Sequence, residues 1–331
     1  MFLHPQHFSG SSSMTAKFRR VASKWLMKCG IGLVLYVLHV FALFLLVFGN
    51  STPRVHKSPC GNALSVCTMV FISSFVTLQG CDASILLNSR ALTCKSEMES
   101  SQNLGIRKLE AINHIKSILE ITCPGQVSCA DIIALAAKES VLITKGSDIK
   151  IPLGRKNSVT CSSPQQADAK LPAAGIAVNE LLRIFTSHRM NLEESVAILG
   201  AHTLGAGHCI NIVNRLYKQK AGDRMNRGFQ ILLRLNCPTE VPLTNLTAVP
   251  NDLTPLTFDN QYYKGILMGT GLLGIDSSIS QDPYTLPIVR QFAADQSYFF
   301  QVFSSAFVKL SSTKVHTHKK SEVRRQCNHI N

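Results

Sequence analysis

Apolar residues recur every three to four positions along most of the chain, the period of helices that bury one face. In 105–121 this pattern places Lys108, Asn113 and Lys116 outside the apolar stripe. Alternating, strand-like patterns are few and short. Further helices are predicted at 129–143, 179–185, 192–202, 210–218, 228–235 and 299–310. The sequence therefore predicts a mostly α fold.

The helix predicted at 192–202 ends in a histidine set among small residues. Asn191 is a suitable N-cap for it, and Glu193 and Glu194 fall in its first turn. His202 follows Gly200 and an alanine, and small neighbours leave room for a flat ligand. A neutral imidazole in such a place can bind a metal through one nitrogen while a hydrogen bond holds the other. A histidine that only fills the core is the competing interpretation.

Residues 29–48 form an almost wholly apolar segment, with Lys24 and Lys28 just before it. As a helix it would be about 30 Å long, enough to cross a bilayer. A secretory signal has the same basic-then-apolar order with a shorter apolar core. We therefore predict a signal peptide cleaved near Gly49, with a retained membrane anchor as the alternative. The Ser-rich residues before Lys24 are either an extension or the product of a wrongly chosen start codon.

Composition places the rest of the chain among globular, core-forming proteins, because only 16% of its 331 residues are charged and 45% are hydrophobic. The net charge of +14 favours polyanionic partners such as anionic wall polysaccharide, although solubilising surface charge is the better explanation for most of these residues. No nucleic-acid-binding motif is present, so no nucleic-acid partner is expected. Eleven cysteines indicate an oxidising compartment, and glycosylation sequons begin at Asn50 and Asn245.

Several motifs from about Cys60 to the end resemble, in order, those of the secretory plant haem peroxidases. The resemblance implies two helical halves that sandwich haem b, in a monomeric domain at 50–331 preceded by the segment 1–49. It also implies reduction of hydrogen peroxide with oxidation of small phenolic donors, in the cell wall or the vacuole. The motifs are QGCDAS (79–84), CPGQVSCAD (123–131), PLGR (152–155), LPA (171–173), ILGAHTLG (198–205), FDNQYY (258–263), GLL (271–273) and RRQC (324–327).

The resemblance assigns roles on the proximal side of the haem. It makes His202 the iron ligand, Asp276 the carboxylate that supports this ligand, and Pro172 a substrate-binding residue. It also implies two calcium sites, whose oxygen ligands suit that ion. The proximal site takes Thr203, Asp252, Thr254, Thr257 and Asp259, with the spacing between Asp252 and Thr254 one residue shorter than usual. The distal site takes Val76, Gly80, Asp82 and Ser84.

Three disulfides follow from the same resemblance. They are Cys60–Cys123, Cys129–Cys327 and Cys209–Cys237. The family's fourth disulfide ends at Cys81, but its usual partner position here is Ser74. Cys67 and Cys94 are the remaining candidates for that partner, and sequence alone does not assign the pairing.

The distal segment departs from the family pattern. Thr68 stands at the position of the distal arginine and Ile72 at that of the distal histidine, and about one helix is missing between Cys60 and Phe71. Glu97 and Asn103 keep positions that would support the absent groups. A general base contributes roughly 10²–10⁴-fold and an electrostatic stabiliser roughly 10²–10³-fold. No distal catalytic residue is therefore retained, and we expect impaired peroxidase activity.

Two alternatives to an impaired peroxidase remain. The chain is either a non-catalytic haem- and calcium-binding wall protein, held to polymers by its basic surface, or a mis-spliced product that does not fold. Peroxide-dependent oxidation of a phenolic donor separates the enzyme from both alternatives.

Overall fold

Helices make up nearly all of the regular structure. The computed structural model describes residues 81–88, 95–100, 103, 106, 109–219, 222–242, 247–313, 315 and 321–331. The chain divides into the units Met1–His56 and Lys57–Asn331, and all described residues belong to the second. Within this described part, no helix has the length and apolarity needed to cross a membrane. The apolar segment 29–48 lies outside it.

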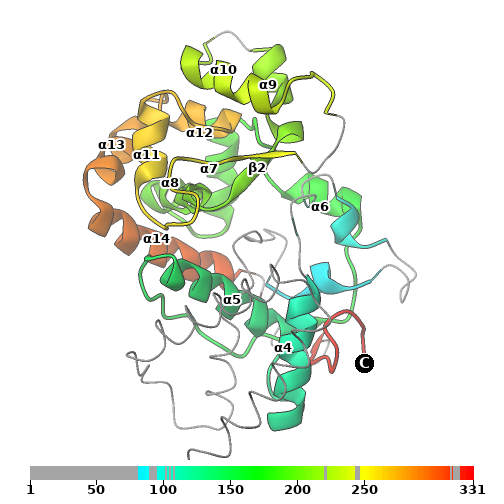
Figure 1. Cartoon of the computed structure of the whole chain (residues 1–331). Helices are drawn as coiled ribbons and strands as arrows, with labels where there is room; N and C mark the ends of the chain where they lie inside the picture. The colour runs from blue at the N-terminus through cyan, green and yellow to red at the C-terminus, as the bar shows by residue number, and fades with distance from the viewer. Residues whose placement is uncertain are drawn as a thin grey trace, which may run out of the picture. The chain divides into compact units, whose positions relative to one another are not determined.

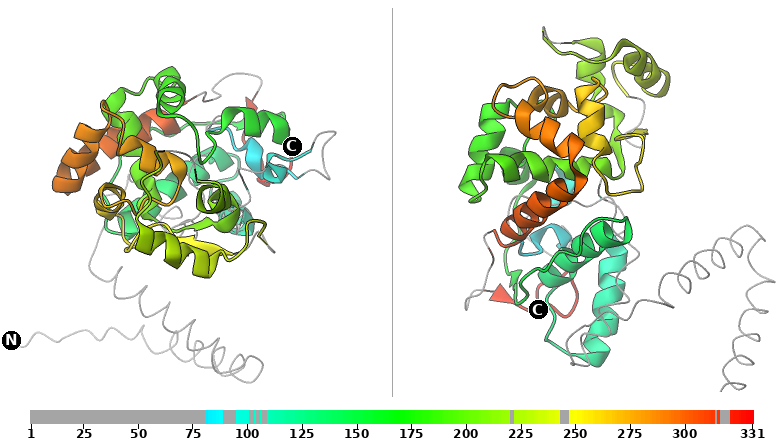
Figure 2. Two further views of the ribbon diagram at one scale, coloured as in Figure 1. Left: turned by 90° about the horizontal axis from the view of Figure 1, so that it is seen from above. Right: turned by 90° about the vertical axis from the view of Figure 1, so that its left-hand side faces the viewer.

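The largest hydrophobic cluster lies among seven helices, most of them in the upper part of Figure 1. Its centre is aromatic: Phe258, Phe299 and Phe303 are fully buried, with ring centroids 4.7–5.8 Å apart. Figures 1 and 2 show α14 between α8 and α5. The seven helices are α5 (Cys129–Ile143), α7 (Val178–Ser187), α8 (Leu192–Leu199), α11 (Gln261–Leu267), α12 (Gly274–Ile279), α13 (Leu286–Ala294) and α14 (Gln296–Ser311).

A second cluster joins α4 (Leu109–Thr122) and α5 (Cys129–Ile143) to the 3₁₀ turn η2 (Ser84–Leu86). Ile112 and Leu119 are buried here, as the helical stripe predicts. The prediction that Lys116 lies outside is wrong, because this side chain is fully buried. Its ammonium group pairs with the Glu120 carboxylate and donates to the Val127 carbonyl, so the charge is compensated inside the fold.

The third cluster contains η7 (Cys209–Asn211), α9 (Val213–Tyr217) and α10 (Arg227–Asn236). The disulfide Cys209–Cys237 closes it. Beside it, the short antiparallel pair β2 (Ala206–His208) and β3 (Ala248–Pro250) joins segments about forty residues apart in the sequence. This pair brings the residues after His202 next to those before Asp252.

The predicted helices agree with the structure except at their ends and for the shortest elements. The helix at 129–143 has the predicted bounds, whereas α8 stops at Leu199 and a 3₁₀ turn, η6 (Gly200–Thr203), carries His202. The helices that were not predicted have six to nine residues, and each shows only a short part of the apolar stripe. The sequence analysis missed α6 (Pro164–Lys170), α11, α12 (Gly274–Ile279) and α13, and the 3₁₀ turn η4 (Glu97–Glu99).

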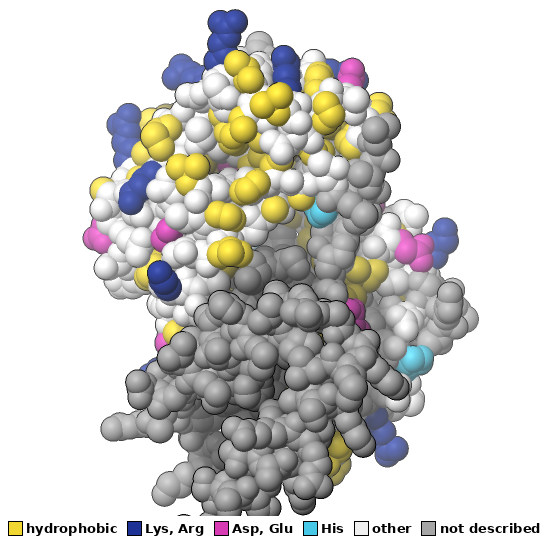
Figure 3. Space-filling view, in the orientation of Figure 1, with side chains coloured by type: hydrophobic (Ala, Val, Ile, Leu, Met, Phe, Trp, Pro, Cys, Tyr) yellow, Lys and Arg dark blue, Asp and Glu magenta, His cyan; other side chains and the backbone are white. Residues whose placement is uncertain are grey.

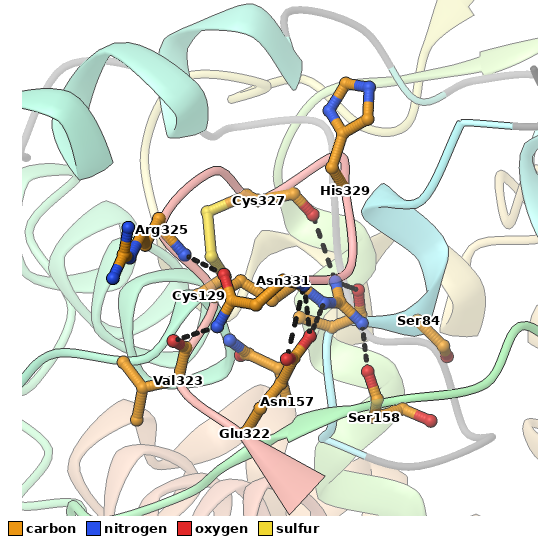
Figure 4. A network of polar contacts seen from close by, with 12 residues as sticks. Ser84, Cys129, Asn157, Ser158, Glu322, Val323, Arg325, Cys327, His329 and Asn331 are labelled. Carbon is orange, nitrogen blue, oxygen red and sulfur yellow. Dashed lines mark hydrogen bonds and ion pairs between the residues drawn. A yellow bond between two sulfur atoms is a disulfide. The ribbon is translucent and has the colours of Figure 1, made fainter. Parts of the chain in front are cut away.

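The C-terminal segment is fastened to the second cluster (Figure 4). The expected disulfide Cys129–Cys327 is present, and β4 (Ser321–Glu322) pairs with β1 (Asn157–Ser158). The buried Arg324 guanidinium donates to the carbonyls of Ala83, at 2.8 Å, and Ser158, at 2.6 Å. The last residues of the chain therefore hold the backbone next to Asp82 in place.

Glu194 is a buried carboxylate that ties α8 to α14. Asn191 caps α8 as expected and forms a capping box with Glu194, and the Glu194 carboxylate also accepts from Lys309, at 2.6 Å, and Ser305, at 2.7 Å. Burial alone would raise the pKa of Glu194, but these donors outweigh burial and the pKa lies below its ordinary value.

We expect Glu194→Gln to lower the free energy of unfolding by about 1.5–3 kcal/mol at pH 7, the usual contribution of a hydrogen bond to a charged group. Because the pKa is lowered by folding, the contribution is complete above the unfolded-state value of about 4.3 and is lost as the pH falls through the lower folded-state value. Urea unfolding of both proteins at pH 7 and pH 3.5 measures this. An equal difference at the two pH values would contradict the assignment.

Candidate functional site

His202 lies in the turn η6, directly after α8. Gly200 precedes it, and a Cβ at this glycine would come within 2.6 Å of the Phe299 ring and of the Tyr263 hydroxyl oxygen. The small residue before His202 therefore makes room for two aromatic side chains of the core. Gly200 therefore lets η6 pack closely against α11 and α14.

Asp276 holds one nitrogen of the His202 ring. The Nδ1 of His202 lies 3.0 Å from Asp276 Oδ1, although 74 residues separate them in the sequence. Burial lowers the pKa of His202, but the Asp276 carboxylate outweighs it, so the pKa is raised overall. The His202 side chain is 33% exposed and that of Asp276 only 2%. Within the described part of the chain, Nε2 has no hydrogen-bond partner, so this nitrogen is the one available to a ligand.

Two further donors hold the Asp276 carboxylate. Asp276 lies in the first turn of α12, where the backbone N–H of Leu273 donates to Oδ2 at 2.8 Å. The hydroxyl of Tyr262 donates to Oδ1 at 2.8 Å. Burial, with the nearby Asp276 charge, holds the pKa of Tyr262 well above its ordinary value. The sequence analysis gave Tyr262 no role, although it lies in the FDNQYY motif.

Contacts with α9 and with the loop between α6 and α7 hold the start of α12 and the residues just before it in place. Arg215 is buried on α9, pairs with Asp223 through two nitrogens at 2.6 and 2.7 Å, and donates to the carbonyls of Gly271 and Leu272. The backbone N–H of Ile275 donates to the carbonyl of Ala174 at 3.0 Å. This bond places the loop between α6 and α7, which contains the half-buried Pro172, against the start of α12.

Four of the five residues expected at the proximal calcium site meet beside His202. The Thr203 hydroxyl lies 2.7 Å from Asp252 Oδ2 and 3.2 Å from Asp259 Oδ1, and the Thr254 hydroxyl lies 3.1 Å from that same Asp259 oxygen. Burial raises the pKa of Asp252, and Asp259 adds to this. Thr257 joins them only through its backbone N–H, which donates to Thr254.

Two neighbouring carboxylates with hydroxyl groups between them are the donor set of a hard cation. The described residues contain no group of three or more His, Cys, Asp or Glu that could hold a metal, so hydroxyl and carbonyl oxygens would have to complete the shell. The side chains present fit calcium better than a transition metal, which prefers nitrogen or sulfur.

Only part of the expected distal side lies in the described residues. The Ser84 N–H and hydroxyl both donate to Asp82 Oδ1, at 3.0 and 2.8 Å. Glu97 is buried, and burial raises its pKa, although Ser84 and Ser162 lower it in part. Asn103 donates to the Glu97 carbonyl at 2.8 Å. The expected residues Val76, Gly80, Thr68 and Ile72 lie outside the described residues.

Cys81 carries a free thiol, whereas the sequence alone left open a disulfide with Cys67 or Cys94. Cys123 and Cys161 are both in disulfides. Cys60, the expected partner of Cys123, lies outside the described residues, and the sequence analysis gave Cys161 no role. Burial is the main cause that raises the pKa of Cys81, to about 11, and Sγ lies 3.6 Å from the Leu310 carbonyl oxygen.

We expect the Cys81 thiol to resist alkylation in the folded protein. At pH 8 roughly one such thiol in a thousand is ionised, and the thiolate is the reactive form. Iodoacetamide labelling followed by peptide mass spectrometry should show this cysteine reacting roughly 100-fold more slowly before unfolding than after it. Equal rates would contradict the burial of this thiol.

Comparisons with known proteins find matches over most of the chain. The family model described as "Peroxidase" matches residues 51–295. Peroxidase 29 of Arabidopsis thaliana is 46% identical over 257 residues, 76% of this chain and 76% of the relative. Peroxidase 21 of the same plant is 32% identical over 323 residues, 92% of this chain and 98% of the relative. Peroxidase 40, also of that plant, is 38% identical over 275 residues, 81% of this chain and 77% of the relative.

Proposed function

Because this chain belongs to the peroxidase family, we propose that it is a secreted haem protein that reduces hydrogen peroxide at the expense of small phenolic donors, with impaired turnover. The observation that carries the proposal is the His202–Asp276 pair, with Nδ1 held at 3.0 Å and Nε2 without a described partner. When bound, haem b supplies the two-electron chemistry that peroxide reduction requires.

His202 and Asp276 have distinct tasks in this proposal. His202 binds the iron through Nε2, and Asp276 accepts a hydrogen bond from Nδ1–H and so fixes the tautomer and the ring direction. The buried carboxylate also makes the imidazole a stronger electron donor. Gly200 and Leu273 help to position His202 and Asp276. Gly200 allows close packing of the turn against the core, and the Leu273 N–H donates to the Asp276 carboxylate.

Calcium is part of the proposal at two places. Thr203, Asp252, Thr254, Thr257 and Asp259 would hold the proximal ion, directly after the iron ligand in the chain. Without this ion, nothing would compensate the repulsion between the Asp252 and Asp259 carboxylates, and the turn that carries His202 would become less rigid. Asp82, Ser84, Val76 and Gly80 would hold the distal ion, with Glu97 close by. We expect weaker binding there, because Ser73 stands at the position of the family's aspartate ligand.

Impairment follows from the distal segment. With Thr68 and Ile72 in place of the arginine and histidine, no positioned base takes a proton from peroxide, and no cation stabilises the departing oxygen. Losing both groups lowers turnover by up to roughly 10⁷-fold if their contributions multiply, and by less because they act together.

A non-catalytic wall protein is the second candidate, and the surface favours it in one respect. Lys and Arg side chains lie around the hydrophobic patches in the upper part of Figure 3. Such a surface suits anionic polysaccharide, with an affinity that falls as salt rises. Retention on pectin that salt reverses, without donor oxidation, would favour this candidate over the enzyme.

Donor oxidation by the purified, haem-loaded chain tests the proposal. The initial rate with hydrogen peroxide and a phenolic donor is compared with the rate for free haem at the same concentration. A faster, saturable rate supports a peroxidase, even one that is slow for its family. A rate equal to that of free haem would overturn the enzymatic part of the proposal.

A further inference from the structure

Tyr262 and His202 share one oxygen of Asp276. The phenol of Tyr262 donates to Oδ1 at 2.8 Å, and His202 Nδ1 lies 3.0 Å from the same atom. The other carboxylate oxygen is held by the Leu273 N–H. Tyr262 is 2% exposed, and its ring meets the imidazole edge-on with centroids 5.8 Å apart. We propose that Tyr262 is a positioning residue that weakens the Asp276–His202 hydrogen bond and so tunes the iron ligand.

The physical argument concerns the charge on one oxygen. A carboxylate oxygen can accept two hydrogen bonds, but each donor draws electron density from it and leaves it a weaker acceptor for the other. In a buried site, where water does not screen the charge, this competition is stronger than at the surface. The Tyr262 hydroxyl therefore reduces the anionic character that Asp276 confers on His202.

A tyrosine that only fills the core would not need this contact. The neighbouring Tyr263 shows the difference, because it is fully buried and its hydroxyl donates to the carbonyls of Val196 and Ala197, at 3.0 and 3.1 Å, in α8. Both tyrosines pack in the same cluster and both hydroxyls are satisfied. Only the Tyr262 hydroxyl reaches the carboxylate, so the two residues form a matched pair that separates hydroxyl chemistry from ring packing.

The expected consequence concerns the iron ligand, and it rests on the proposed function, in which His202 binds haem iron. A less anionic imidazole is a weaker donor to the metal, and outer contacts of this kind set the electronic state of a metal ligand. With the Tyr262 hydroxyl present, we expect a weaker iron–histidine bond than in a chain that lacks this hydroxyl. We also expect the ferrous form of the haem to be more accessible.

Resonance Raman spectroscopy of the ferrous, haem-loaded full chain tests this. In Tyr262→Phe we expect the iron–histidine stretching line to move to higher frequency, because Asp276 Oδ1 is left to His202 alone. In Tyr263→Phe the line should not move, although thermal unfolding should show that this variant also loses stability. An unmoved or lowered line in Tyr262→Phe, or the same rise in Tyr263→Phe, would overturn the inference.

A second measurement needs no variant of Tyr262, in case Tyr262→Phe does not fold. In the unaltered chain without haem, proton NMR with labelled tyrosine should show a slowly exchanging Tyr262 hydroxyl proton close to the His202 ring. Rapid exchange of this proton would overturn the inference. If the unaltered haem-loaded chain shows no iron–histidine line at all, the proposed function fails and this inference fails with it. A line that Tyr262→Phe leaves unchanged overturns the inference alone.

Discussion

We expect His202→Ala to bind haem at least roughly 100-fold more weakly than the unaltered chain. Loss of outer-shell partners alone costs 10–100-fold, and here the ligand itself is removed. Haem titration followed by visible absorbance measures the affinity. The fold should largely survive, because Asp276 keeps the Tyr262 and Leu273 donors.

His208 provides the matched control for this substitution. It is another histidine on the same side of the fold, in β2, only six residues along the chain. Its Nδ1 has no hydrogen-bond partner among the described residues, and no carboxylate orients the ring as Asp276 orients His202. His208→Ala should therefore bind haem as the unaltered chain does. Equal losses in both variants would show that the effect comes from general destabilisation.

The second large effect is expected for Asp276→Ala. This change leaves three donors without their acceptor, from His202, Tyr262 and Leu273. Each hydrogen bond to a charged group is worth about 1.5–3 kcal/mol, and the losses do not add fully. We expect a clear fall in the free energy of unfolding of the haem-free chain, measured by urea denaturation, and a 10–100-fold weaker haem affinity.

Two controls sharpen the Asp276 prediction. Asp276→Asn keeps the shape and one acceptor oxygen but removes the charge, so its losses should fall between those of the alanine variant and the unaltered chain. Asp295 is also a carboxylate at a helix N-terminus, where it accepts from Tyr298 N–H at 2.9 Å. Asp295→Ala should cost about 1 kcal/mol of stability and leave haem binding unchanged. Weakened haem binding in Asp295→Ala would contradict a specific role for Asp276.

Much of the helical fold follows from the period of apolar residues, because the longer helices bury one face over several turns. The helix at 129–143 was predictable to the residue. Short helices such as α12, of six residues, were not, since they show less than two turns of any pattern. Lys116 was placed wrongly because periodicity does not reveal that Glu120 and a carbonyl compensate a buried charge.

The candidate site shows a sharper limit. The pairing of His202 with Asp276 came from resemblance alone, since no local pattern links residues 74 positions apart. The role of Tyr262 was invisible for the same reason, because it depends on how α11 and α12 pack against each other. Asp259 and the three oxygen-bearing residues around it meet because β2 and β3 pair, and those two strands are too short to leave a clear signal in the sequence.

The central claim is that His202 provides a working proximal site opposite an impaired distal side. The visible absorption spectrum of the chain loaded with haem and calcium, followed in time after adding hydrogen peroxide, tests it most directly. The account predicts the spectrum of a histidine-bound ferric haem that peroxide changes only slowly and mainly by bleaching. A spectrum no different from that of free haem would contradict the proximal assignment. A fast change that a phenolic donor reverses would contradict the distal impairment.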